Sequence, residues 1–217
     1  MILTRYLYDK GKVETSLKVA IKNHYYQEAN FWAYELYFSG FQTTVLDILH
    51  EIYTSLFSEN HPKLGTYIQM KKATNTPELI ATIIKNLTMK NPEIKETPNT
   101  KFVNVKKHHI EPFMTKEPED LPFKKPWQFL RQVCEYRVLG DATKREIAEF
   151  RGKWLDISVK SPIWLERITQ YNGNIEDGVV VFNDEERFYD KYGYEPDEQS
   201  LEIQMNCIGI LVDRKII

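Results

Sequence analysis

The strongest hydrophobic pattern in the chain lies at residues 26–41, which read YQEANFWAYELYFSGF. At 100° per residue the apolar side chains fall on two opposite sides of a helix, and such a helix is normally packed between neighbours. The pattern therefore favours a buried central helix, with Trp32 and Leu36 in the core, over an aromatic ligand pocket or a base-stacking platform. Gly40 suits the left-handed residue after a last turn, and Phe41 can then fold back on Leu36, as in a Schellman ending.

Apolar stripes at helical spacing predict four further helices before residue 90. The clearest start is Thr76-Pro77-Glu78, which offers a hydroxyl cap, a proline at the first helical position and an acid near the positive helix end. Five helices joined by short links predict an N-terminal array of helical hairpins over residues 1–90. The four further helices are expected at Lys12–His24, Thr44–Phe57, Pro62–Lys72 and Thr76–Leu87.

The stretch from Asn91 to Pro126 holds six of the ten prolines of the chain. Prolines at this density disfavour regular structure, so residues 91–125 are predicted to form either a linker or an arm docked on the surface. Within it, Lys101–Ile110 alternates as a short strand would. The apolar residues that would anchor a docked arm are Phe113, Met114, Leu121 and Phe123.

Residues 126–217 are again predicted to be mainly helical, with a small β-hairpin formed by Ile175 and Val179–Phe182 around Glu176-Asp177-Gly178. The predicted fold class is mainly α. It comprises the N-terminal array of helical hairpins, a proline-rich crossing segment, and a C-terminal helical part with the β-hairpin. Helix starts in this last part are expected near Pro126, Asp141, Ser161 and Asn183.

The net charge is only −2, but the charges are unevenly spread. Residues 61–107 hold nine lysines and three glutamates, whereas residues 176–202 hold ten acids against Arg187 and Lys191. Such asymmetry can mark a partner surface, although solvated faces, or pairing of the two regions within the fold, would also produce it. The candidate partner-binding residues are Lys71, Lys72, Lys101, Lys106, Lys107, Phe102, Phe113, Phe123, Glu185, Glu186 and Asp190.

No motif of a known catalytic or cofactor site occurs in the sequence. The five histidines lack the H-E-x-x-H spacing typical of zinc, and neither a phosphate-binding glycine loop nor a G-x-S-x-G elbow is present. We therefore expect no catalytic residue, no metal and no cofactor. Cys134 and Cys207, the only cysteines, supply no disulfide framework and fit a reducing, cytoplasmic compartment. No apolar run approaches the ~20 residues of a membrane span, so no membrane partner is expected.

Three classes of function stay open at this point. The first is a non-enzymatic interaction or scaffold module that holds a protein partner through helix faces and charged patches. The second is a nucleic-acid-associated factor, favoured by the lysines around Phe102 but disfavoured by an isoelectric point of about 6.2. The third is an enzyme with an unrecognised site, which a pocket combining Glu35 with a histidine and a tyrosine would favour. The pattern predicts no oligomeric state.

Two parts of the sequence resemble uncharacterised proteins encoded by large nucleocytoplasmic DNA viruses, the giant viruses. They are FWAYELYFSGF at Phe31–Phe41, and the pair SPIWLERI at Ser161–Ile168 with FYDKYGYEPDEQ at Phe188–Gln199. The resemblance spans most of the chain but brings no known activity, so it assigns no functional residues. It implies a viral protein made in a host cell and located in the host cytoplasm or the virus factory. The nucleic-acid alternative would then act in viral gene expression.

Overall fold

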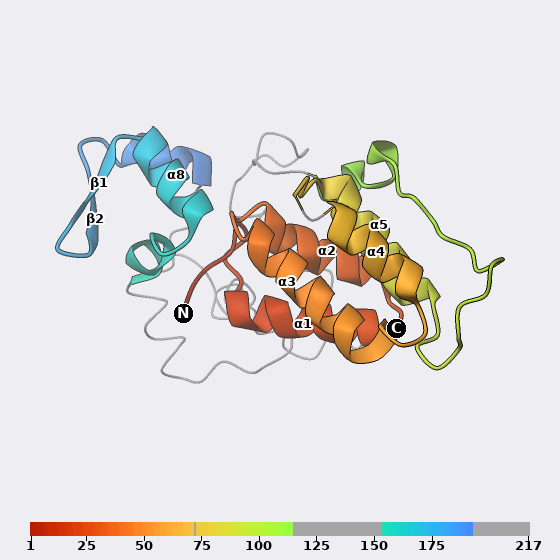
Figure 1. Cartoon of the computed structure of the whole chain (residues 1–217). Helices are drawn as coiled ribbons and strands as arrows, with labels where there is room; N and C mark the ends of the chain where they lie inside the picture. Colours follow the sequence, from red (N-terminus) through yellow and green to blue (C-terminus); the bar gives the residue numbers. More distant parts are fainter. Residues whose placement is uncertain (72, 115–152, 193–217) are drawn as a thin grey trace, which may run out of the picture. The chain divides into compact units, whose positions relative to one another are not determined.

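A computed structural model of the 217-residue chain describes residues 1–71, 73–114 and 153–192 (Figure 1). This part of the chain is mainly helical and contains one small antiparallel β-hairpin, which confirms the predicted fold class. None of its helices is long and apolar enough to cross a membrane. Cys134, Cys207, Lys72 and Phe123 lie outside the described residues, as do the helices expected from Pro126 and Asp141 up to residue 152.

The chain divides into two compact units whose boundaries differ from those expected at residues 90 and 125. The first unit comprises Met1–Val13, Phe38–Gly40 and, within Thr115–Ile217, the described residues 153–192. The second unit comprises Glu14–Tyr37 and Phe41–Met114. Residues 91–114 therefore belong to the helical unit that precedes them, and this part of the proline-rich segment is a docked arm rather than a linker.

The second unit is built on helices joined by short connections. Its central helix α2 packs on α3 and on α5, and α1 begins in the first unit and continues into the second. The elements are α1 (Lys10–Lys22), α2 (Tyr26–Tyr37), α3 (Gln42–Ile52), the π-helical turn η1 (Tyr53–Phe57), α4 (Pro62–Lys71), α5 (Pro77–Met89), and the 3-10 turns η2 (Lys107–His109) and η3 (Glu111–Phe113).

Helix α2 is buried on all sides over Ala29–Leu36. Trp32 and Leu36 are fully buried, which confirms the predicted core positions. Gly40 has a positive φ of 93°, and the Phe41 N–H donates to the Leu36 carbonyl at 3.1 Å, so the Schellman ending is also confirmed. Glu35 is fully buried as well.

Two predicted helix starts, those of α5 and α3, had different outcomes. At α5 the Thr76 side chain accepts a hydrogen bond from the Leu79 N–H at 3.3 Å, and Pro77 opens the helix, as predicted. The start expected at Thr44 was wrong, because α3 begins two residues earlier and the Phe41 carbonyl accepts the Val45 N–H.

The first unit joins the start of the chain to the elements after residue 153. The Trp164 indole N–H donates to the Thr4 carbonyl at 2.8 Å, and the Arg167 guanidinium donates to the Arg5 carbonyl at 2.9 Å. Gly40 fits closely here, because a methyl group at that position would come within 2.5 Å of Pro162 Cβ. The elements are the helical residues 153–158, α8 (Pro162–Gln170), β1 (Gly173–Glu176), β2 (Val179–Phe182) and α9 (Glu186–Tyr192).

The β-hairpin is the one the sequence predicted. Gly173 pairs with Phe182 and Glu176 with Val179, and the turn residues Asp177 and Gly178 both have positive φ. That geometry is a type I′ turn, which an Asp-Gly pair favours. The predicted start of α9 at Asn183 was wrong, since the helix begins at Glu186. Asn183 therefore lies before the helix, where its side chain lines the cavity described below.

Candidate functional site

Two polar side chains on one face of α5, and a third on the residue directly after the helix, hold an extended segment by its backbone. We call Thr82, Asn86 and Lys90 the α5 ladder. The Thr82 hydroxyl accepts the Val105 N–H at 2.9 Å. The Asn86 side chain accepts the Val103 N–H at 3.1 Å and donates to the Val103 carbonyl at 2.7 Å. The Lys90 ammonium donates to the Lys101 carbonyl at 3.2 Å.

The ladder works because the helix and the segment advance in step. Four residues of an α-helix rise by about 6 Å, and two residues of an extended chain advance by roughly 6.6–6.8 Å. Thr82 and Asn86, four residues apart on α5, can therefore bond alternate residues of the segment, and Lys90 after the helix end reaches the next alternate residue, Lys101. The segment runs antiparallel to α5, since its first residue lies at Lys90 and its last at Thr82.

Asn86 is the best-satisfied member of the ladder. Its amide also donates to the Thr82 carbonyl at 2.8 Å, and the residue is only 1% exposed. A side-chain amide offers two donors and an acceptor oxygen, and all of these functions are used here. Asn86 therefore bonds both the N–H and the carbonyl of Val103 and so fixes its position.

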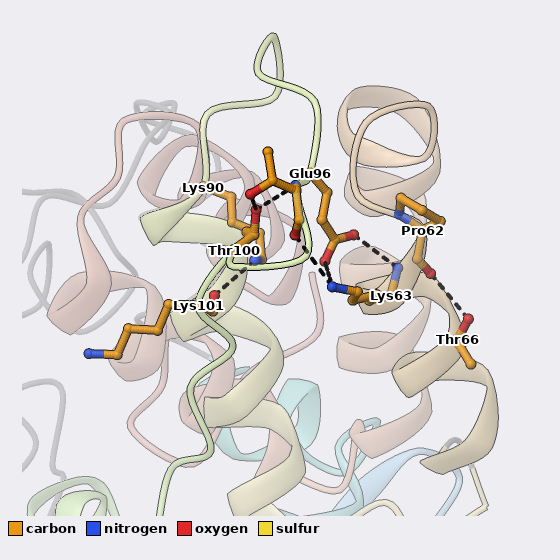
Figure 2. A network of polar contacts seen from close by, with 8 residues as sticks. Pro62, Lys63, Thr66, Lys90, Glu96, Thr100 and Lys101 are labelled. Carbon is orange, nitrogen blue, oxygen red and sulfur yellow. Dashed lines mark hydrogen bonds and ion pairs between the residues drawn. The ribbon is translucent and has the colours of Figure 1, made fainter.

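The loop that leads into this segment, residues 91–100, is held by a charged network around Glu96 (Figure 2). The Glu96 carboxylate accepts the Lys63 backbone N–H at 3.2 Å, at the N-terminus of α4, and lies 3.8 Å from the Lys63 ammonium. A carboxylate is favourable there because the first N–H groups of a helix lack partners within the helix. The Glu96 N–H donates in turn to the Asn60 carbonyl at 2.7 Å.

Electrostatics around Glu96 affect Lys90. Burial lowers the pKa of the Lys90 ammonium, and the neighbouring Lys63 lowers it further, whereas Glu96 acts in the opposite direction. Lys90 is only 6% exposed. Burial, as the largest of these effects, therefore sets the direction of the shift.

Apolar contacts complete the docking of residues 91–114. The Phe102 ring lies 4.9 Å from that of Tyr67 on α4, and the Phe113 ring lies 5.8 Å from that of Tyr34 on α2. Val105 and Ile110 are buried. Of the anchors predicted from sequence, Phe113 and Met114 are half-buried, and Phe102 is an anchor as well.

The predicted basic residues Lys71, Lys101, Lys106 and Lys107 are exposed and belong to the second unit. Lys71 lies one helical turn after Tyr67, on the same side of α4, so Lys71 and Lys101 both lie near the Tyr67–Phe102 contact. Lys106 and Lys107 follow directly after the last ladder bond, where η2 begins.

The predicted acidic residues Glu185, Glu186 and Asp190 are exposed and belong to the first unit. Asp184 precedes them and lines a cavity of about 660 Å³ together with Arg187. The other lining residues come from the end of α8, from the turn between α8 and β1, from β1 and from the connection after β2. They are Thr169, Gln170, Tyr171, Asn172, Asn174 and Asn183.

The residues considered for an enzyme site have other surroundings. Glu35 does not line this cavity. His24 and His61 each hydrogen-bond a backbone carbonyl, that of Thr88 at 2.9 Å and that of Asn91 at 2.8 Å. Among the described residues no group of three or more histidine, cysteine or acidic side chains is placed to hold a metal ion.

Sequence reasoning missed the ladder and the cavity. The signal for the ladder was a polar residue at every fourth position, at Thr82 and Asn86 of α5 and at Lys90 directly after it. The cavity left a weaker signal, a concentration of asparagines at Asn172, Asn174 and Asn183.

Comparison of the chain with known protein families, with curated proteins and with solved structures found no match.

Proposed function

We propose that the protein is a non-enzymatic binding module that holds an acidic protein partner on the segment Lys101–Lys107. The observation that carries the proposal is the α5 ladder, which fixes the backbone of this segment while Lys101, Lys106 and Lys107 stay exposed. We extend the proposal to a viral protein acting in the cytoplasm of a host cell. That extension rests only on the sequence phrases that resemble giant-virus proteins.

A fixed backbone favours binding because less conformational freedom is lost when the partner arrives. The lysine side chains supply positive charge that steers an acidic surface into contact and disfavours basic partners. Phe102 is only partly covered by Tyr67 and offers an apolar contact between the charges. A rigid segment with charges at set positions is thus better suited to a shaped partner than a flexible lysine-rich tail would be.

A nucleic acid is the second candidate partner, because the rings of Tyr67 and Phe102 lie among lysines. Lysines neutralise phosphates, and aromatic rings stack on bases. The two candidates differ in their salt dependence. Retention of single-stranded RNA or DNA that falls steeply with salt concentration would favour the nucleic acid, and no retention at low salt would exclude it.

The experiment compares partner capture by two charge-reversed variants. Tagged wild-type protein is purified from expressing or infected cells and the co-purifying chains are identified. The same is done for Lys106→Glu/Lys107→Glu and for the matched control Lys153→Glu/Lys160→Glu, whose lysines are exposed in the first unit. We expect an acidic protein to co-purify with the wild type and the control but not with the Lys106/Lys107 variant.

Two outcomes would contradict the proposal. One is that the wild-type protein purifies without any co-purifying protein from cells that contain its natural partners. The other is a set of co-purifying proteins that is the same for the Lys106/Lys107 variant as for the wild type.

A further inference from the structure

The cavity of the first unit lies where the end of α8 meets two connections of the hairpin. The last turn of α8, the turn into β1 and the connection from β2 to α9 all contribute to its wall. Its volume of about 660 Å³ is within the range of roughly 300–1,000 Å³ that is typical of small-molecule sites. Every lining residue belongs to the first unit, so the site does not depend on the second.

Four of the side chains in the wall are amides. Each amide offers two donors and an acceptor oxygen. Within the part of the chain that the structure describes, none of these four side chains makes a hydrogen bond to the protein. They are therefore available to a polar ligand, in contrast to the fully used amide of Asn86. The four are Gln170, Asn172, Asn174 and Asn183.

The charges in the wall favour a ligand without net charge. Asp184 and Arg187 carry opposite charges and cancel formally. The adjoining Glu185 and Glu186 are exposed and would repel a phosphate or a carboxylate at short range. The exposed lysines that suit anions, such as Lys106 and Lys107, belong to the second unit.

Tyr171 supplies an apolar part of the wall. It is half-buried, and its ring packs edge-on against Phe188 and Tyr192, with 5.9 Å between centroids in both cases. An aromatic ring held in this way can pack against the C–H groups of a ligand, since its faces are apolar and its hydroxyl is polar.

From these features we propose that the cavity binds a sugar ring through its neighbouring hydroxyl groups. A hydroxyl both donates and accepts, so two adjacent hydroxyls match the donor and acceptor of one amide. Asp184 accepts from hydroxyls, Arg187 donates to them, and the C–H groups of the ring pack on Tyr171. A pyranose of a saccharide and the ribose of a nucleoside share this chemistry.

The test is an NMR titration of the full-length, ¹⁵N-labelled chain with glucose, galactose, N-acetylglucosamine, adenosine and inorganic phosphate as separate probes. We expect at least one sugar-containing probe to give saturable shifts in the first unit with a Kd on the order of 1 mM. Adenosine alone would identify a ribose site, and a hexose alone a saccharide site.

The variants Asn174→Ala and Asn183→Ala are each expected to weaken that binding by about tenfold, which corresponds to the loss of one well-placed hydrogen bond. Both positions are exposed. An NMR spectrum without ligand that matches that of the wild type verifies that each variant is folded. Asn99→Ala, at an exposed asparagine of the second unit, is the matched control and should bind as the wild type does. Asn172 is left unchanged because its φ is 59°. Alanine disfavours this left-handed conformation, so a substitution there would disturb the turn as well as the cavity.

Three results would overturn the proposal. The first is no saturable shift with any sugar at roughly 50 mM, far above the expected Kd. The second is sugar binding that both cavity variants leave intact. The third is phosphate binding in place of sugar binding.

Discussion

Helices α2 and α5 pack against each other in the second unit, yet they hold their surroundings by different forces. They are similar in length, 12 and 13 residues, and both are largely buried. In α2 the buried surface centres on Trp32 and its apolar neighbours. In α5 one face carries apolar residues, and another carries Thr82 and Asn86 of the ladder, which Lys90 continues directly after the helix.

The difference shows that burial alone does not tell which force fixes a neighbour. Apolar packing is non-directional and is satisfied by any side chain of suitable size and shape. Hydrogen bonds to a backbone depend on position, so the ladder selects both the register and the direction of the segment at Lys101–Val105. Residues 101–105, which belong to no helix or strand, thereby acquire a fixed path.

The largest expected effect is on the apolar side of the comparison. Trp32→Ala should lower the free energy of unfolding by about 3–5 kcal/mol, because it removes a fully buried indole and leaves a cavity. Urea unfolding followed by circular dichroism measures the change. Tyr25→Ala, at an aromatic residue that is 55% exposed, is the control and should change stability by less than about 0.5 kcal/mol. Full stability of the Trp32 variant, combined with loss of partner binding, would assign this helix to function instead.

An intermediate effect is expected on the polar side. Asn86→Ala should cost about 1–3 kcal/mol, because the N–H and carbonyl of Val103 lose their partner on α5. The same urea titration measures it, with Asn99→Ala as the control. A cost equal to that of the control would mean that the ladder does not hold the segment.

A smaller effect should appear as a change with pH. The pKa of Lys90 is lowered in the folded protein, chiefly by burial, so the unfolded chain binds the proton more strongly. The resulting destabilisation is fully present below the folded pKa, and it is relieved as the pH rises towards the ordinary value of 10.5. The stability difference between the wild type and Lys90→Met should therefore move in favour of the wild type as the pH rises towards 10.5, measured by urea unfolding at intervals. A difference that stays constant across this range would contradict the shift.

The smallest effect on stability is expected where we place the partner. Lys106→Glu/Lys107→Glu should leave the unfolding free energy unchanged within about 0.5 kcal/mol, because both side chains are exposed. Thermal unfolding of this variant beside the wild type verifies the point. A large loss of stability would show that the two lysines belong to the docking of the segment rather than to its outer face.

Much of the fold follows from short-range patterns in the sequence. The stripe around Trp32, the Thr76-Pro77 start of α5, the Gly40 ending and the Asp-Gly turn each act within a few residues, and all were predicted correctly. The starts at Thr44 and Asn183 were wrong, because in both cases a carbonyl of a nearby residue begins the helix instead.

The sites depend on contacts between residues distant in the sequence, which patterns do not contain. Thr82 and Val105 are 23 residues apart, and no periodicity links them. The sequence offered two readings for residues 91–114, because prolines exclude regular structure but do not determine whether an irregular chain is docked. The hydrogen bonds from Thr82 and Asn86 show that the segment is docked. The sequence alone does not reveal these bonds, because it does not show which residues the two side chains contact.

Amide hydrogen exchange at Val103 and Val105 tests the central claim most directly. If the α5 ladder fixes the segment, both amides should exchange far more slowly than in an unstructured peptide, although they belong to no helix or sheet, and Asn86→Ala should remove the protection of Val103. Exchange of both amides at unstructured rates in the wild type would contradict the account, since the segment would then be a mobile linker and its lysines would have no fixed positions.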